Sequence, residues 1–224
     1  AGYCLNGNDV RCLHEDKFGQ IWAGLWEGGV NLLTTVRPLF NLIEPYERGV
    51  RDGLTDKSVM GLCFDKSGLL WGGTNSFGLN VFSKVLKRVK THPLEVGPCV
   101  QSIVCDSEGR MWFGSYNGGL FVRFTDGFRQ ILPNGSEDVR TLYEDGQKQM
   151  FVGTSDGVYI VDVKTLKVKR HLRTKNNLVR TIAIDEDKNI WIGTYGGGVE
   201  VYSSRFVLKK RYDRKRMDGL MPSD

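Results

Sequence analysis

The chain has 224 residues, of which 40% are hydrophobic and 25% are charged, with 28 glycines and a formal net charge of +5. This composition is that of a folded domain large enough to bury a core, and it excludes a disordered or collagen-like chain. No apolar run approaches the roughly 18 residues of a membrane span. Because the sequence does not begin with Met, we expect it to be part of a longer protein.

One pattern of residues occurs five times along the chain. Each copy starts at a Val in a short apolar run, passes through an Asp to an aromatic residue, and reaches a Gly before another apolar run. The aromatic residues that mark the copies are Trp22, Trp71, Trp112, Phe151 and Trp191. The period is roughly 40 to 50 residues, which is typical of solenoids and propellers.

Four short runs of β-branched, aliphatic and aromatic residues make up each copy, with Gly, Asp and Asn between them. In the last copy the runs are 179–184, 190–194, 199–202 and 206–212. Such runs predict strands, and no window has a helical period. Four antiparallel strands per copy predict an all-β fold, a β-propeller with five blades in one domain or segment over residues 1–224. The expected blades are residues 8–49, 57–95, 98–134, 137–175 and 177–214.

Turns and packing account for the repeated residues. The Asp-x-x-Gly of three copies, as at 16–19, predicts a hairpin whose Gly has a positive φ angle. We interpret these Asp side chains as turn caps. The motif Trp is expected to pack between neighbouring blades, and the Gly that follows it to allow another backbone to approach. The fourth copy departs most, with Phe151 in place of Trp, Gly146 directly after its Asp and a shorter loop before Gly157.

The repeated pattern closely resembles the two-component regulator propeller repeat. Residues 190–199, Ile-Trp-Ile-Gly-Thr-Tyr-Gly-Gly-Gly-Val, carry the resemblance most clearly. It implies a ligand-sensing role, often for glycan fragments, in the periplasmic sensor region of a hybrid two-component system anchored in the inner membrane. Related sensors are larger propellers, so we expect an arc of a larger ring rather than a closed five-blade ring. An arc exposes two apolar blade faces, which favours a homodimer.

The loops between the second and third strands and the linkers between blades are expected to gather at one mouth of the propeller. Their residues vary while the frame repeats, as an asymmetric binding site requires. Aromatic rings there can stack on sugars, Asn can bind hydroxyls, and Arg can bind a carboxylate or sulfate. The alternative is that these are ordinary loop residues, with Arg paired to Asp9 or Asp138. The candidates are Arg11, Trp26, Asn75, Phe77, Tyr116, Asn117, Arg140, Asn177, Arg180 and Tyr195.

Other classes of site have little support in the sequence. The five cysteines have neither C-x-x-C nor zinc spacing, so no metal or cofactor is expected. His14, His92 and His171 fall in different strands, so no catalytic residue is assigned and an enzyme is not expected. Lysines in the fourth strands are explained as protection of an exposed sheet edge, and nucleic acid is not expected as a partner.

The sequence therefore predicts a non-enzymatic sensor segment. Its expected partner is an oligosaccharide or another small extracellular ligand, bound at the loop mouth and signalled through blade or dimer geometry. Contact with a membrane would occur only through segments outside this sequence. A protein–protein interaction scaffold without a small ligand stays open as the alternative, because fold alone does not choose between them.

Overall fold

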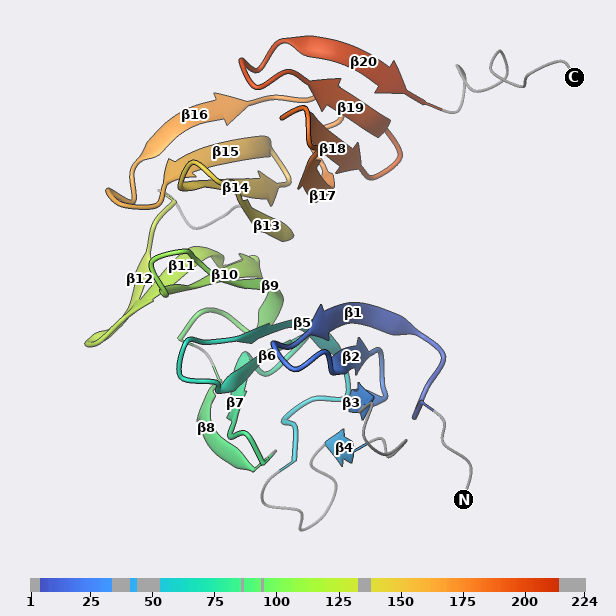
Figure 1. Ribbon diagram of the computed structural model, residues 1–224, viewed down its shortest axis with the longest axis vertical. Helices are drawn as coiled ribbons and strands as arrows, with labels where there is room; N and C mark the ends of the chain where they lie inside the picture. The colour runs from blue at the N-terminus through green and yellow to red at the C-terminus, as the bar shows by residue number, and fades with distance from the viewer. Residues whose placement is uncertain are drawn as a thin grey trace, which may run out of the picture. The chain divides into compact units, whose positions relative to one another are not determined.

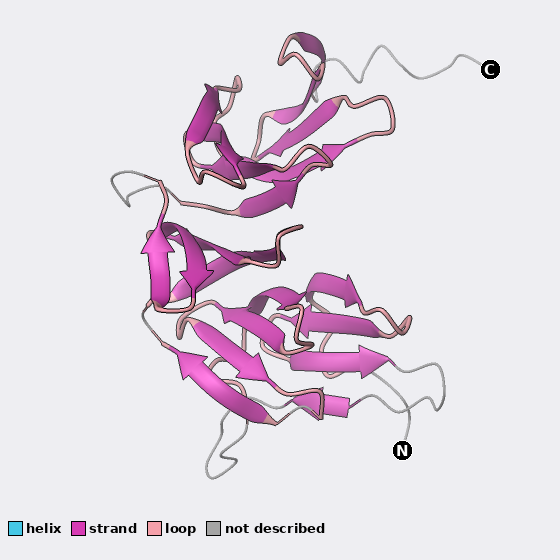
Figure 2. Cartoon of the chain, turned by 60° about the vertical axis from the view of Figure 1, so that its left-hand side comes forward, coloured by secondary structure: helices cyan, strands magenta, loops and turns pink. Residues whose placement is uncertain are grey.

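A computed structural model of the chain describes residues 5–33, 41–43, 53–85, 87–93, 95–132 and 138–213. These residues form five antiparallel sheets of four strands each, and they include no helix. The strands of each sheet lie side by side in chain order (Figures 1 and 2). Each sheet is one propeller blade, so the prediction of a propeller built from five four-stranded blades is confirmed.

The strands of the five blades have the following bounds. Blade 1 contains β1 (Val10–Glu15), β2 (Ile21–Leu25), β3 (Gly29–Leu33) and β4 (Asn41–Ile43). Blade 2 contains β5 (Val59–Phe64), β6 (Leu70–Thr74), β7 (Leu79–Phe82) and β8 (Arg88–His92). Blade 3 contains β9 (Cys99–Cys105), β10 (Met111–Tyr116), β11 (Gly119–Phe124) and β12 (Gly127–Gln130). Blade 4 contains β13 (Thr141–Glu144), β14 (Gln149–Thr154), β15 (Gly157–Asp162) and β16 (Val168–Leu172). Blade 5 contains β17 (Val179–Ile184), β18 (Ile190–Thr194), β19 (Gly198–Tyr202) and β20 (Leu208–Tyr212).

The chain divides into two compact units, residues 1–136 with blades 1 to 3 and residues 137–224 with blades 4 and 5. Within the first unit, Trp22 of blade 1 packs in a buried cluster with Leu62 and Phe82 of blade 2. Trp71 of blade 2 contacts blade 3 in the same way, with 5.5 Å between its ring centroid and that of Phe113. The motif aromatic residue thus packs against the following blade, as expected.

In the second unit, the equivalent aromatic residue is Phe151. It lies in a buried cluster with Ile182, Ile192 and Tyr202 of blade 5. A side chain at Gly153 would not fit, because its Cβ would lie 2.5 Å from a side-chain carbon of Thr141 and 2.7 Å from one of Val179. At Gly153 the crowding comes from side chains, those of Thr141 in the same blade and of Val179 in the next. The predicted approach of another backbone occurs at Gly73, where a Cβ would lie 2.7 Å from the carbonyl oxygen of Val100.

The hairpin between the first two strands is closed by its Asp side chain. In blade 2 the Oδ1 of Asp65 accepts hydrogen bonds from the backbone N–H groups of Ser67 and Leu69. Its Oδ2 accepts a hydrogen bond of 2.9 Å from the indole N–H of Trp71. Turn capping is confirmed, and the bond to the indole is a second role that the sequence analysis did not predict. The same bond occurs in three other blades, as Trp22–Asp16, Trp112–Asp106 and Trp191–Asp185.

These hydrogen bonds lower the pKa of three hairpin carboxyls, those of Asp16, Asp65 and Asp185. In Asp185 the bond from Trp191 is the largest cause, and Asn189 adds to it. In Asp65 burial is the largest single cause and raises the pKa, but the hydrogen bonds from Ser67, Trp71 and Leu69 outweigh it. Such a carboxyl binds fewer protons in the folded than in the unfolded chain. Its contribution to stability is therefore complete above the ordinary pKa of 3.8 and is lost as the pH falls through the lower, folded pKa.

We expect the free energy of unfolding to fall steadily between about pH 5 and pH 2 as these carboxyls are protonated. Urea unfolding followed by tryptophan fluorescence at each pH measures this dependence. Asp65→Asn removes one titrating group while keeping an acceptor for the turn, so its pH dependence should be shallower. An equal slope in both proteins would show that Asp65 does not contribute.

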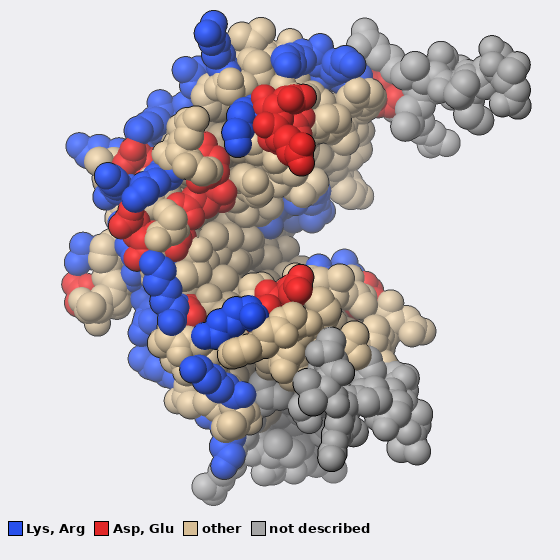
Figure 3. All heavy atoms as spheres, in the orientation of Figure 1, with Lys and Arg blue, Asp and Glu red and all other residues tan. Residues whose placement is uncertain are grey.

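The fourth strand is the outer edge of each blade. Lys and Arg side chains gather over β16 and β20 in Figure 3. Strand β20 has the sequence Leu-Lys-Lys-Arg-Tyr and is exposed along most of its length. Charged side chains on such an edge prevent other strands from pairing with it. In the part of the chain described, no helix is long and apolar enough to cross a membrane.

Candidate functional site

The loop between the second and third strands meets the linker that precedes the first strand. The backbone N–H of Trp26 donates to the carbonyl of Asp9 at 2.8 Å, and that of Tyr195 donates to the carbonyl of Leu178 at 2.8 Å. The same pairing joins Asn75 to Ser58 and Ser155 to Asp138. Loop and linker therefore share one end of these four blades, as expected for the loop mouth.

Two of the candidate arginines lie at β-bulges. The pairing of β1 with β2 skips a residue between Val10 and Cys12, and that of β17 with β18 skips one between Val179 and Thr181. The skipped residues are Arg11 and Arg180. A bulge leaves one residue unpaired and redirects its side chain, which brings both arginines toward the loops.

In blade 1 the bulge joins two candidates. The Arg11 guanidinium lies 4.7 Å from the ring centroid of Trp26, a cation–π distance. Its Nη2 also lies 3.0 Å from Oδ2 of Asp9. Arg11 thus has a contact for each interpretation. Its stacking on Trp26 fits a ligand-binding role, and its ion pair with Asp9 fits an ordinary loop residue.

The candidates of blades 2 and 3 lie on the corresponding loops. Phe77 is 53% exposed and Tyr116 is 36% exposed. The Oδ1 of Asn75 accepts a long hydrogen bond from the thiol of Cys99. Asn117 occupies a turn with a positive φ of 57°. These loops therefore present two exposed rings, whereas Asn75 and Asn117 help to shape the loops.

Blade 5 repeats the arrangement of blade 1. The Arg180 guanidinium lies 5.1 Å from the ring centroid of Tyr195, whose side chain is 63% exposed. The amide Nδ2 of Asn176, which was not a candidate, donates to the carbonyl of Tyr195 at 2.7 Å. Asn177 has a structural contact, since its Oδ1 accepts from the backbone of Thr174 at 3.0 Å.

Arg140 of blade 4 differs from the other two arginines. Its Nη2 lies 3.2 Å from Oδ2 of Asp138, and both side chains are largely buried. This is the pairing that the alternative interpretation predicted for it. The structure thus brings Arg11 to Trp26 and Arg180 to Tyr195, each within one unit, and engages Arg140 with its own linker.

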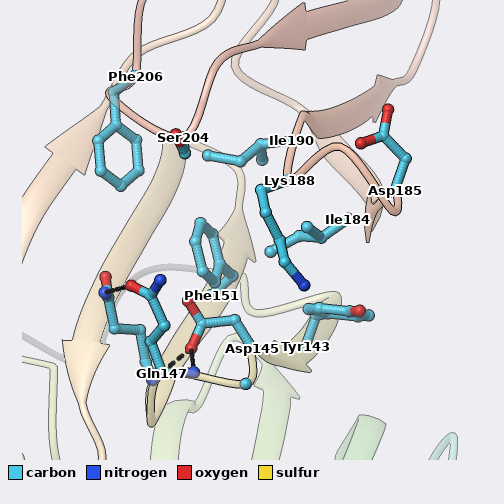
Figure 4. Close-up of a pocket in the computed structure, with 12 residues that line it drawn as sticks. Tyr143, Asp145, Gln147, Phe151, Ile184, Asp185, Lys188, Ile190, Ser204 and Phe206 are labelled. Carbon is cyan, nitrogen blue, oxygen red and sulfur yellow. Dashed lines mark hydrogen bonds between the residues drawn. The ribbon is translucent and has the colours of Figure 1, made fainter.

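Cavities lie at the other end of the strands, beside the first hairpins, where no site was predicted. One of about 430 Å³ is lined by His14, Phe18 and Trp22 of blade 1 and by Phe64 and Lys84 of blade 2. Burial lowers the pKa of His14, against the opposing effect of Asp16. A second cavity of about 300 Å³ lies between blades 4 and 5 (Figure 4). The volumes of both fall in or near the range of small-molecule sites.

Groups suited to metal binding are not gathered in the described residues. These residues contain no cluster of three or more His, Cys, Asp or Glu side chains able to hold a metal ion. The three histidines lie apart in the chain, His14 in β1, His92 in β8 and His171 in β16. His92 stacks on Trp71, and His171 stacks on Tyr159.

The chain is a β-propeller made of sequence repeats. Each repeat forms one four-stranded blade, and four of the five blades contain the same Asp–Trp hydrogen bond. The sequence matches the family described as two component regulator propeller over residues 4–27, 95–117 and 175–196. These three segments of the chain carry the two-component regulator propeller repeat. No curated protein sequence matches it.

The solved structures that resemble the chain include extracellular domains of two-component systems and a lyase. The extracellular domain of a protein described as a hybrid two-component system of B. thetaiotaomicron is 35% identical, with a TM-score of 0.73 over 93% of this chain and 29% of that chain. A second such domain from the same organism is 14% identical, with a TM-score of 0.57 over 90% of this chain and 37% of that one. Virginiamycin B lyase from Staphylococcus aureus is 12% identical, with a TM-score of 0.73 over 91% of this chain and 69% of the lyase. The last two share the fold alone, and the chain spans less than a third of the first.

Proposed function

We propose that this chain is a non-enzymatic, ligand-sensing segment of an extracytoplasmic two-component signalling protein. The ligand is an oligosaccharide with an acidic group, bound at the loop mouth. The location and the sensor role follow the 35% identical extracellular domain. The signal would pass through a change in blade or dimer geometry to parts of the protein outside this sequence.

The observation that carries the proposal is the repeated contact of a bulge arginine with a loop aromatic ring. Tyr195 keeps most of its surface open to solvent while the Arg180 guanidinium lies against it. The ring offers an apolar face for a sugar, and the guanidinium offers donors for a carboxylate or sulfate. Arg11 and Trp26 make the same contact in blade 1.

Titration with neutral, uronic and sulfated oligosaccharides is expected to raise the melting temperature for an acidic member of the panel. A ligand at about 100 times its dissociation constant adds roughly 2.7 kcal/mol to the free energy of unfolding. Tyr195→Ala should abolish the shift, because it removes the stacking surface and leaves Arg180 without its support.

Phe18→Ala is the matched control for this experiment. Phe18 is 71% exposed, but it lies on the first hairpin, at the other end of the strands. The control should bind the oligosaccharide as the unchanged protein does. A shift that survives Tyr195→Ala, or no shift with any sugar, would contradict a sugar site at the loop mouth.

An interaction scaffold is the second candidate, and it is favoured by the apolar face of blade 1. Leu13 is 68% exposed, whereas the equivalent Leu62 and Ile103 of blades 2 and 3 are 8% and 6% exposed. Val10 and Leu33 extend this face, which forms an open apolar hollow. We propose that a second copy of the chain covers the face in a homodimer.

Sedimentation equilibrium tests the homodimer. The unchanged protein is expected to give twice the mass of the chain, and Leu13→Lys is expected to give a monomer because a buried ammonium opposes association. Val85→Lys, which changes an exposed residue outside this face, should stay dimeric. A monomeric mass for the unchanged protein at high concentration would argue against the homodimer.

A further inference from the structure

Blade 4 lacks the indole that the hairpin carboxylate binds elsewhere. In blade 5 the Oδ1 of Asp185 accepts from the backbone of Asn189, and the Oδ2 accepts from Trp191 and from the Asn189 amide. In blade 4 the Oδ1 of Asp145 accepts two backbone hydrogen bonds, from Gln147 and Gln149. Phe151 stands where the Trp would be and has no N–H to donate. Among the described residues, nothing donates to Oδ2 of Asp145.

This carboxylate oxygen faces a cavity. The cavity of about 300 Å³ lies between the blade 4 hairpin and blade 5, within the second unit. In Figure 4 the dashed lines that reach Asp145 end on one of its oxygens, and the other oxygen points toward the ring of Phe151. Phe151 and Phe206 form an aromatic wall, with 6.3 Å between their ring centroids. Tyr143 contributes a third ring to the lining.

A cation also points into this cavity. Lys188 takes the turn position that Gly19, Gly68 and Gly109 occupy in blades 1 to 3, and it has a positive φ of 63°. A side chain at positive φ strains the backbone, and glycine would avoid the strain. In Figure 4 the ammonium of Lys188 extends toward Tyr143 and Asp145. Its ammonium forms no ion pair within the described part of the chain, so its charge is available to a ligand.

Taken together, these groups point to a ligand of definite chemistry. An acceptor, Asp145 Oδ2, and a cation, Lys188, face the same aromatic wall. The volume accommodates one ring with a short substituent.

We propose that the groove between blades 4 and 5 binds a small cyclic carboxylate that carries a ring N–H or O–H donor. The donor binds Oδ2 of Asp145, in the place that the motif indole fills in the other four blades. The carboxylate binds the Lys188 ammonium, and the ring packs against Phe151 and Phe206. This site is separate from the loop mouth and does not depend on the function proposed for it.

Isothermal titration calorimetry with chosen probes tests the proposal. Indole-3-acetate supplies a ring N–H and a carboxylate, and glucuronate supplies hydroxyl donors and a carboxylate. At least one of the two is expected to bind, which distinguishes an aromatic from a saccharide ligand. 1-Methylindole-3-acetate lacks the N–H and should bind at least about tenfold more weakly than indole-3-acetate. Glucose lacks the carboxylate and should bind at least about tenfold more weakly than glucuronate.

Phe151→Trp is the most informative variant, because it rebuilds the motif. Its indole should occupy Asp145 as in blade 5, and binding should fall by about tenfold or more. Lys188→Gly should weaken the binding of both carboxylate probes by a similar factor, and it should also relieve the backbone strain at this position. Lys148→Gly is the matched control, since Lys148 has the same turn position in blade 4, with a φ of 61°, but does not line the cavity.

The outcomes separate this proposal from the loop-mouth function. Lys148→Gly and Tyr195→Ala should both bind the probe as the unchanged protein does. Loss of binding in Tyr195→Ala, or undiminished binding in Phe151→Trp, would overturn the proposal. So would the absence of binding by both carboxylates at concentrations on the order of 10 mM, where ligands of this size with these contacts should be detected.

Discussion

Asp106→Ala is expected to lower the free energy of unfolding of the first unit by about 3 kcal/mol. The Asp106 side chain is buried, and its Oδ2 accepts hydrogen bonds from the Trp112 indole at 2.7 Å and from the Arg110 Nε at 3.0 Å. Its Oδ1 accepts from the backbone of Arg110. Trp112 is fully buried, so its N–H would find no water in exchange. Urea unfolding measures the loss.

The control is Asp145→Ala in blade 4. That residue caps the same hairpin through two backbone hydrogen bonds, but it has no indole partner and is only partly buried. Its replacement should cost about 1 kcal/mol. Equal losses in the two variants would mean that the bond to the indole contributes nothing beyond capping the turn.

Gly78→Ala is expected to destabilise the first unit by about 3 kcal/mol or more. Gly78 has a positive φ of 71°, and a Cβ there would lie 2.3 Å from the carbonyl oxygen of His92 and 2.5 Å from that of Pro93. Both contacts are with backbone, which cannot rotate away as a side chain would. Thermal and urea unfolding should both report the loss.

Gly196→Ala separates the two causes of that loss. Gly196 has the same positive φ of 71°, but no atom lies within 4 Å of the position of its Cβ. Only the strain of the left-handed backbone remains, so the expected cost is about 1 kcal/mol. If Gly196→Ala were as destabilising as Gly78→Ala, the backbone clash at Gly78 would not be the cause.

The blade architecture was predictable because its determinants are local. Turn residues such as Gly68, with its positive φ, and short runs of strand-forming residues recur at a fixed period, so each copy supports the others. The Asp–Trp bond was not predicted, although both residues were noticed. Asp65 and Trp71 are six positions apart in the chain, and their side chains meet only when the hairpin pairs its strands.

The candidate loop site was predictable in part. Its position at one end of each blade follows from the order of the strands, and the pairing of Trp26 with Asp9 agrees with it. The contacts of Arg11 and Arg180 with loop rings depend on β-bulges. A bulge is a property of register between two strands, so it does not appear in either strand alone.

The cavity between blades 4 and 5 shows what only the tertiary structure decided. The sequence determined by itself that the chain forms repeated four-stranded blades, because strand runs, turns and spacing are local. It also marked Phe151 as a departure from the repeat. Because of this departure, Oδ2 of Asp145 faces a cavity that Lys188 also lines. The cavity depends on how one blade packs against the next. Residues about 40 apart in the chain meet there, and packing between blades sets their distance.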